Sequence, residues 1–87
     1  MKIEFDPHKA IGNINKHGVS FDEAASCLLD PDALVQEDRD AQGEQRWVLL
    51  GMSDSARLLT VTYALRGDSI RLISARKPTT KEVNCYA

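Results

Sequence analysis

The chain has 87 residues, of which 43% are hydrophobic and 28% charged, and its formal net charge at pH 7 is −2. This length suits one domain, and the composition is that of an ordinary globular protein, so disorder is not the default expectation. No apolar run approaches the roughly 20 residues that span a bilayer, and the acidic N-terminus does not fit a signal peptide. We therefore expect a single cytoplasmic domain over residues 1–87 with no membrane partner.

The first elements are a short strand and a helix. Residues 3–5 alternate between apolar and polar side chains, which predicts a strand. Asp6 can cap a helix, and Pro7 fits its first position because that N–H needs no partner. Gly18 can adopt the left-handed conformation that ends a helix, so we predict a helix over residues 7–17. The side chains expected to face the core are Ala10, Ile11 and Ile14.

Two further helices are marked by capping boxes. Ser20 is followed three residues later by Glu23, and the pair Asp30-Pro31 stops the helix that they start. Near the C-terminus, Thr79 and Glu82 have the same spacing and predict a short last helix.

The middle of the chain predicts strands. Four candidates cover residues 33–37, 44–52, 56–65 and 69–77, with turn signals at residues 40–43, 53–55 and 66–68. The last turn is short and contains glycine, so the strands on either side of it should form an antiparallel hairpin. We predict an α+β fold with two N-terminal helices on one face of an antiparallel sheet of about four to five strands. Such a sheet can leave its other face open to a ligand.

The small net charge hides a strong asymmetry. Residues 20–54 carry nine acidic and two basic residues, whereas residues 55–81 carry six basic residues against Asp68 alone. Screening limits the reach of a distant charge to about 10 Å, so the basic half can bind phosphates on an acidic protein. The alternative is that these cations are solvated strand ends.

The predicted helix over residues 7–17 carries a polar stripe. At its C-terminus the helix dipole favours cations, which singles out Lys16 and His17. The alternative is the ordinary polar face of an amphipathic helix. The stripe consists of Lys9, Asn13, Lys16 and His17.

Two arginines stand out on the last predicted strand. Strict alternation sends Arg71 and Arg76 to opposite faces, because they are five residues apart. Either a β-bulge re-aims one of them, or they serve different surfaces. Arg76 is the stronger candidate because it lies close to the N-terminus of the last helix, where anions bind. Lys81 in the first turn of that helix opposes the dipole, which is a weak sign of function.

Metal and cofactor chemistry finds no support in the sequence. The chain has only two histidines and two cysteines, without the spacing of a metal site. Cys27 and Cys85 are expected to be reduced thiols. We predict neither a metal nor a cofactor.

Several segments together resemble the BrnT family of toxins. The matching stretches are FDPHK at 5–9, NINKHGVSFDEA at 13–24, RWVLLG at 46–51, RLLTV at 57–61 and RLISARK at 71–77. The KHGVSF and ISAR blocks are the most specific parts, and the resemblance covers nearly the whole chain.

This resemblance implies a compact fold like that of RelE-type toxins and a metal-independent endoribonuclease that arrests growth by blocking translation. It also implies a BrnA-like antitoxin with a ribbon-helix-helix part, through which alone the toxin would meet DNA. Carried over by motif, the catalytic candidates are Lys16, His17, Arg57, Arg71 and Arg76. The RNA-binding candidates are Lys9, Asn13, Ser74, Lys77 and Lys81.

The expected chemistry needs no cofactor, because RNA carries its own nucleophile in the 2′-OH. The protein has to orient the strand, offset charge in the transition state and assist proton transfer. Arginine suits the second task, and His17 is the candidate acid or base, with Lys16 or Lys81 as substitutes. Two other functions remain open at this point: a non-catalytic RNA-binding module, and a domain whose basic surface binds an acidic protein.

Overall fold

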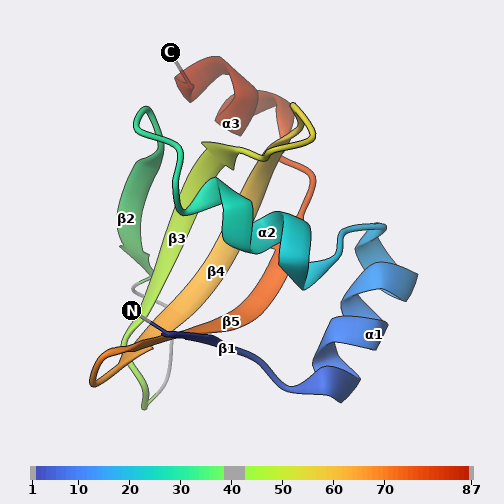
Figure 1. The fold of residues 1–87 in the computed structure, drawn as a ribbon. Helices are drawn as coiled ribbons and strands as arrows, with labels where there is room; N and C mark the ends of the chain where they lie inside the picture. The colour runs from blue at the N-terminus through green and yellow to red at the C-terminus, as the bar shows by residue number, and fades with distance from the viewer. Residues whose placement is uncertain (1, 39–42, 87) are drawn as a thin grey trace.

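The computed structural model describes residues 2–38 and 43–86. Every predicted helix and strand is present, with ends that differ from the prediction by no more than two residues. The predicted turn at residues 40–43 falls largely outside the described residues. In chain order the elements are β1 (Lys2–Glu4), α1 (Pro7–His17), α2 (Phe21–Cys27), β2 (Leu34–Asp38), β3 (Arg46–Met52), β4 (Leu58–Arg66), β5 (Ser69–Arg76) and α3 (Thr80–Cys85) (Figure 1).

The five strands form one sheet in the order β1-β5-β4-β3-β2. The strands from β2 to β5 are antiparallel, and β4 and β5 form the predicted hairpin. The sheet differs from the predicted one in β1, which pairs in parallel with β5. A parallel pair requires a long connection, and here nearly the whole chain lies between the two strands. The sheet is therefore mixed.

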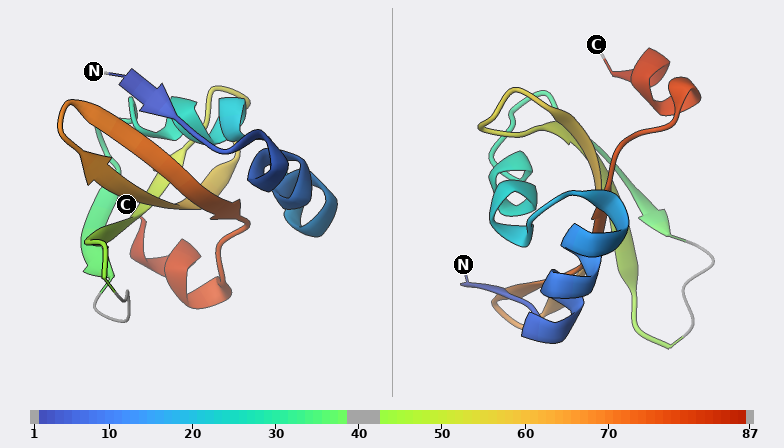
Figure 2. Two further views of the ribbon diagram at one scale, coloured as in Figure 1. Left: turned by 90° about the horizontal axis from the view of Figure 1, so that it is seen from below. Right: turned by 90° about the vertical axis from the view of Figure 1, so that its right-hand side faces the viewer.

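The helices lie on both sides of the sheet. Helix α2 packs across β3, β4 and β5, and α1 lies beside β5. Within residues 2–38 and 43–86, α3 is the only helix on the opposite side, where it covers one end of the sheet (Figure 2). We call this second side the open face. None of the described helices is long and apolar enough to cross a membrane.

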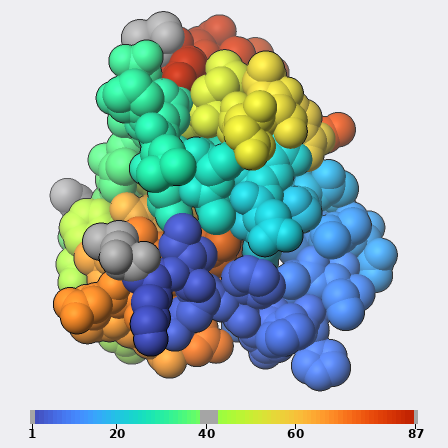
Figure 3. All heavy atoms as spheres, viewed as in Figure 1, coloured from blue at the N-terminus to red at the C-terminus, as the bar shows by residue number. Residues whose placement is uncertain are grey.

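The core fills the space between α2 and the sheet. Phe21, Ala24 and Cys27 of α2 are buried against Leu59 and Val61 of β4. At Gly51, an added Cβ would lie 2.9 Å from Leu49 Cδ2 and 3.1 Å from the Cys27 carbonyl oxygen. This glycine therefore lets α2 approach β3 closely. Figure 3 shows α2 filling the surface between α1 and the loop that joins β3 to β4.

The orientation of α1 differs from the prediction. Ile11 and Ile14 were expected in the core, but they are 61% and 49% exposed, whereas Asn13 is 7% exposed. The Asn13 amide donates to the carbonyl oxygens of Val19 (2.9 Å) and Ala75 (2.8 Å). Its oxygen accepts from the Ala75 N–H at 3.1 Å. These bonds fix which side of α1 faces β5, and they take precedence over burial of the isoleucines.

Replacing Asn13 with alanine is expected to destabilise the fold. The change leaves buried backbone groups of Val19 and Ala75 without partners, which costs about 2–4 kcal/mol in the free energy of unfolding. Urea unfolding followed by circular dichroism measures this loss. The matched control is Asn15→Ala, an exposed position on the same helix. Equal stability of the two variants would contradict a structural role for Asn13.

Candidate functional site

A β-bulge in β5 decides which side chains share the open face. Thr62 pairs with Ser74, but the next residue, Tyr63, pairs with Leu72, so Ile73 is an extra residue in β5. Thr60, Thr62 and Ala64 alternate along β4 and share one face, and their β5 partners are Arg76, Ser74 and Arg71. The bulge therefore brings Arg71 and Arg76 to the same face, one of the two outcomes that the sequence left open. Leu72, which alternation alone grouped with Arg76, lies in the core at 1% exposure.

Pairing with β3 and β2 extends these three positions into rows of residues that run across the sheet. The rows on the open face are Asp38·Arg46·Ala64·Arg71, then Gln36·Val48·Thr62·Ser74, then Leu34·Leu50·Thr60·Arg76. The opposite face carries core residues such as Leu49, Val61 and Ala75. The open face thus combines arginines, hydroxyl groups and an apolar corner. Sequence reasoning missed Arg46 and Gln36, although strand alternation from Val48 and Leu50 could have placed Arg46.

Arg76 is held in place by Glu82 of α3. Nη1 and Nη2 of Arg76 donate to the two carboxylate oxygens of Glu82, at 2.8 and 3.1 Å, and Nη1 also donates to the Lys77 carbonyl at 3.2 Å. Of the five N–H donors of arginine, these contacts use three. The described residues offer no partner to the other two, on Nε and Nη2, which lie together along the side of the guanidinium group. Arg76 can therefore bind a phosphate without losing Glu82.

Glu82 is fixed from several directions. Its Oε1 also accepts from Thr79 N (2.8 Å) and from Thr60 Oγ1 (3.2 Å), and Thr79 accepts in return from the Glu82 N–H. Arg76 and these hydrogen bonds lower the pKa of Glu82 to about 2. The end of α3 is tied down separately, because Tyr86 Oη donates to Asp30 Oδ2 at 2.5 Å. The short C-terminal helix thus positions an arginine on the sheet.

Arg57 lies on the other side of the sheet, in an ion pair with α2. Its Nε and Nη2 donate to the carboxylate of Glu23 at 2.9 and 2.5 Å. Ser53 Oγ donates to the same carboxylate at 2.7 Å. The pairing lowers the pKa of Glu23 and raises that of Arg57. Arg57 therefore fastens α2 to the turn between β3 and β4, and its two N–H donors on Nη1 have no partner within residues 2–38 and 43–86.

Lys16 and His17 lie in the last turn of α1, close to Arg57. Arg57 Nη2 is 3.4 Å from the carbonyl oxygen of Gly18, the residue that caps this helix. The bond from Asn13 to Ala75 places α1 beside the end of β5, where Arg76 lies. Lys16 is exposed and His17 half-buried. Lys16, His17, Arg57 and Arg76 therefore occupy one end of the sheet, although Arg57 and Arg76 are on opposite faces.

The remaining candidates divide between this end and other places. Lys77 directly follows β5 and Lys81 lies in the first turn of α3, and both are exposed. Arg71 shares the face of Arg76 but lies near the start of β5, next to Glu4 of β1. Lys9 is exposed near the start of α1, away from this end. Asn13 is buried with its amide bonded, so we leave it out of the site.

The part of the chain that the structure describes contains no group of three His, Cys, Asp or Glu side chains that could hold a metal ion. The positively charged side chains of this part of the chain are more informative than its acidic ones. Arg57 and Arg76 are paired with glutamates, whereas no ion pair within residues 2–38 and 43–86 involves Arg71, Lys16, Lys77 or Lys81. Anions that approach the end of β5 therefore meet three lysines that these ion pairs do not neutralise, Lys16, Lys77 and Lys81.

Comparison with known proteins identifies a family and a similar solved structure. A family model described as "Ribonuclease toxin, BrnT, of type II toxin-antitoxin system" matches residues 5–82. The chain is also similar to the crystal structure of the ribonuclease toxin BrnT of Brucella abortus, with a TM-score of 0.72 and 25% sequence identity. The alignment covers 92% of this chain and 99% of that one. A search of curated proteins finds no match.

Proposed function

Since this chain belongs to the BrnT family of ribonuclease toxins of type II toxin–antitoxin systems, we propose that it cuts RNA internally on the open face, without a metal ion. The observation that carries this proposal is the bulge in β5, which sets Arg71, Ser74 and Arg76 on one accessible face. The family description also argues against the two non-catalytic functions that the sequence left open. Blocked translation and growth arrest are the proposed consequence in the cell.

In the proposed reaction the RNA 2′-OH attacks the adjacent phosphate and the bond from phosphorus to the 5′ oxygen of the next nucleotide breaks. The products are a 2′,3′-cyclic phosphate and a 5′-OH end. Arg76 offers Nε–H and an Nη2–H to the phosphate oxygens, where negative charge grows in the transition state. Glu82 keeps this guanidinium group in place before RNA binds, so little reorganisation is needed. Arg71 contacts a second phosphate further along the face, and the Ser74 hydroxyl lies between the two.

Proton transfer is proposed for the end of the sheet. His17 takes the proton of the 2′-OH or gives one to the leaving 5′ oxygen, with water carrying the other proton, and Lys16 beside it stabilises the negative charge. Arg57 adds the N–H groups on its Nη1 to this end of the sheet. Lys9, Lys77 and Lys81 attract the RNA backbone through charge alone and carry no sequence information.

Membership in a type II toxin–antitoxin family gives the chain a cognate antitoxin as its partner. We propose that this antitoxin is BrnA-like, with a ribbon-helix-helix part that binds DNA, so the toxin meets DNA only through it. An antitoxin that covers the open face would hide the arginines from RNA.

Expression of the chain with and without its antitoxin tests this function. Alone, the chain is expected to stop growth within a few generations and to fragment cellular RNA. Co-expression of the antitoxin encoded beside it is expected to restore both growth and intact RNA. Purified protein in the presence of EDTA is expected to cleave RNA at the rate seen without it. Intact RNA in cells that express the chain alone, at a confirmed protein level, would contradict the proposal.

A further inference from the structure

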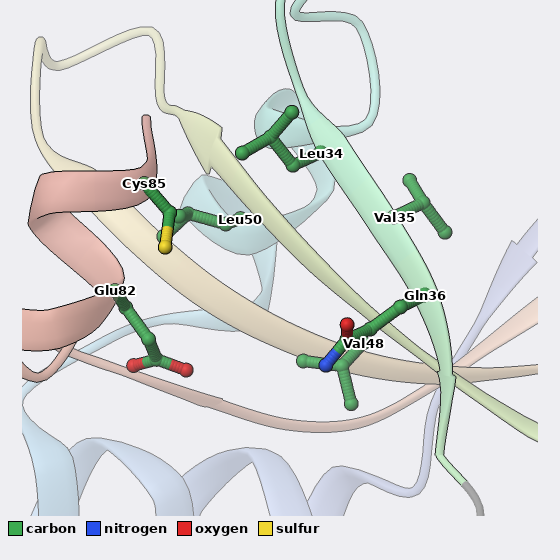
Figure 4. Close-up of a pocket in the computed structure, with 7 residues that line it drawn as sticks. All are labelled: Leu34, Val35, Gln36, Val48, Leu50, Glu82 and Cys85. Atoms are coloured by element: carbon green, nitrogen blue, oxygen red, sulfur yellow. The ribbon is translucent and has the colours of Figure 1, made fainter. Parts of the chain in front are cut away.

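A small pocket opens on the open face beside Arg76. It has a volume of about 150 Å³ and lies between β2, β3 and α3 (Figure 4). Leu34, Val48 and Leu50 form an apolar wall, and Glu82 and Cys85 close it from the α3 side. Sites that enclose a whole small ligand usually measure about 300–1,000 Å³, so this pocket suits a single flat ring or one side chain.

The polar groups of the pocket are an amide and a carboxylate. Gln36 directs its amide along the sheet past Val48, on the same side as Glu82 (Figure 4). That amide makes no hydrogen bond to any of the described residues, whereas Gln45 nearby donates to Glu37 at 3.1 Å. Glu82 Oε2 accepts only from Arg76 Nη2 within residues 2–38 and 43–86, and so keeps a position for a second donor.

Glu82 joins the pocket to the proposed catalytic position. One carboxylate oxygen of Glu82 is 2.8 Å from Arg76 Nη1, and the same side chain lines the pocket. A phosphate on the side of the Arg76 guanidinium group is therefore one side chain away from the pocket. We take this arrangement to suit a phosphate and the base of the nucleotide next to it.

We propose that the pocket between β2, β3 and α3 binds the base next to the scissile phosphate, and that Gln36 reads the edge of this base. The inference rests on the proposed ribonuclease function and adds the determinant of sequence preference. A base has apolar faces, which fit Leu34, Val48 and Leu50, and a polar edge, which needs donors and acceptors. The Gln36 amide provides both, and Glu82 accepts from an N–H of the base.

An apolar side chain of a protein partner fits this pocket less well. It would fill the space beside Leu34 and Leu50 but leave the Gln36 amide and the Glu82 carboxylate covered without a new partner, which costs free energy. A phosphate inside the pocket is also disfavoured, because Glu82, which lines it, is negatively charged. A neutral ring with a polar edge can pack against the apolar side chains and hydrogen-bond to Gln36 and Glu82.

Replacing Gln36 with leucine tests the inference. Gln36 is exposed on an edge strand, so the fold is expected to persist. Cleavage sites are mapped on an RNA pool with a randomised segment, and affinity is measured on 2′-O-methyl oligonucleotides that differ only at the base next to the target phosphate. Loss of a paired base contact is expected to reduce discrimination at that position by roughly five- to 150-fold, with cleavage of the pool retained. Gln45→Leu, outside the pocket, is expected to keep the parent preference.

A variant that fills the pocket provides a second test of the inference. Leu34→Trp is expected to lower affinity and discrimination together, whereas Ile11→Trp, at an exposed position on α1, is expected to change neither. Unchanged preference in both Gln36→Leu and Leu34→Trp would overturn the inference. So would loss of antitoxin binding in Leu34→Trp with unchanged preference, since the pocket would then serve the antitoxin. If the parent binds the oligonucleotides with base preference but cleaves nothing, the proposed catalysis fails and the pocket assignment stands.

Discussion

Arg76→Ala is expected to lower the rate of RNA cleavage by about two to three orders of magnitude and to abolish growth arrest. Removal of one preorganised donor to a developing negative charge typically has an effect of this size. The fold is expected to survive, because the Arg76 side chain is 39% exposed. Glu82 also keeps its bonds to Thr60 and Thr79. Single-turnover cleavage of one short RNA measures the effect, and circular dichroism checks the fold.

Arg66→Ala is the matched control for this variant. Arg66 also lies at a strand end and is paired with a glutamate, since its Nε is 3.0 Å from Glu44 Oε2. It lies at the other end of the sheet from Arg76, so its loss removes an ion pair without changing the surroundings of Arg76. Arg76→Lys is expected to recover only part of the activity, because an ammonium group cannot offer two N–H groups in one plane. Equal cleavage by the parent and Arg76→Ala would exclude Arg76 from the site.

His17→Gln is expected to lower the cleavage rate by about 10²–10⁴-fold while sparing affinity for RNA. Proton transfer acts on the transition state, whereas a phosphate contact acts on binding as well. Arg71→Ala is therefore expected to weaken both binding and cleavage, and to reduce the salt dependence of binding. Glutamine keeps a polar side chain at the end of α1, so loss of the fold is not expected to confound the result.

The measurement is the cleavage rate across about pH 5.5–8.5, together with affinity for a 2′-O-methyl RNA that cannot react. His8→Gln, in the first turn of the same helix, is the control and is expected to behave like the parent. If His17→Gln shows the parent rate and the parent pH profile, His17 is only a cation at the helix end. Proton transfer would then pass to Lys16, Lys81 or water.

These two variants together separate the parts of the site. Arg76 is positioned by α3, and His17 by the end of α1. A large effect of both would place the reacting phosphate between Arg76 and His17, near the end of β5. If only Arg76→Ala has a large effect, the reaction takes place on the open face, and Lys16 and His17 of α1 contribute to RNA binding.

The sequence determined the secondary structure of this protein, because the relevant signals are local. Asp6, Ser20 and Thr79 each cap a helix through a side chain that accepts a backbone N–H two or three residues later. Gly18 ends α1 with φ of 69°, as the glycine signal predicts. The hairpin turn at Gly67 follows in the same way. Such contacts span a few residues, so they can be read without the fold.

The tertiary structure decided how the site is put together, because its contacts join distant parts of the chain. Asn13 bonds to Ala75 across 62 positions, and this turned α1 so that two isoleucines face outward. Arg57 and Glu23 are 34 residues apart, and nothing local marks them as partners. The bulge at Ile73 arises from pairing between β4 and β5, and alternation within β5 alone cannot reveal it. The sequence therefore named most of the candidate residues, whereas strand pairing and buried hydrogen bonds decided which of them share a surface.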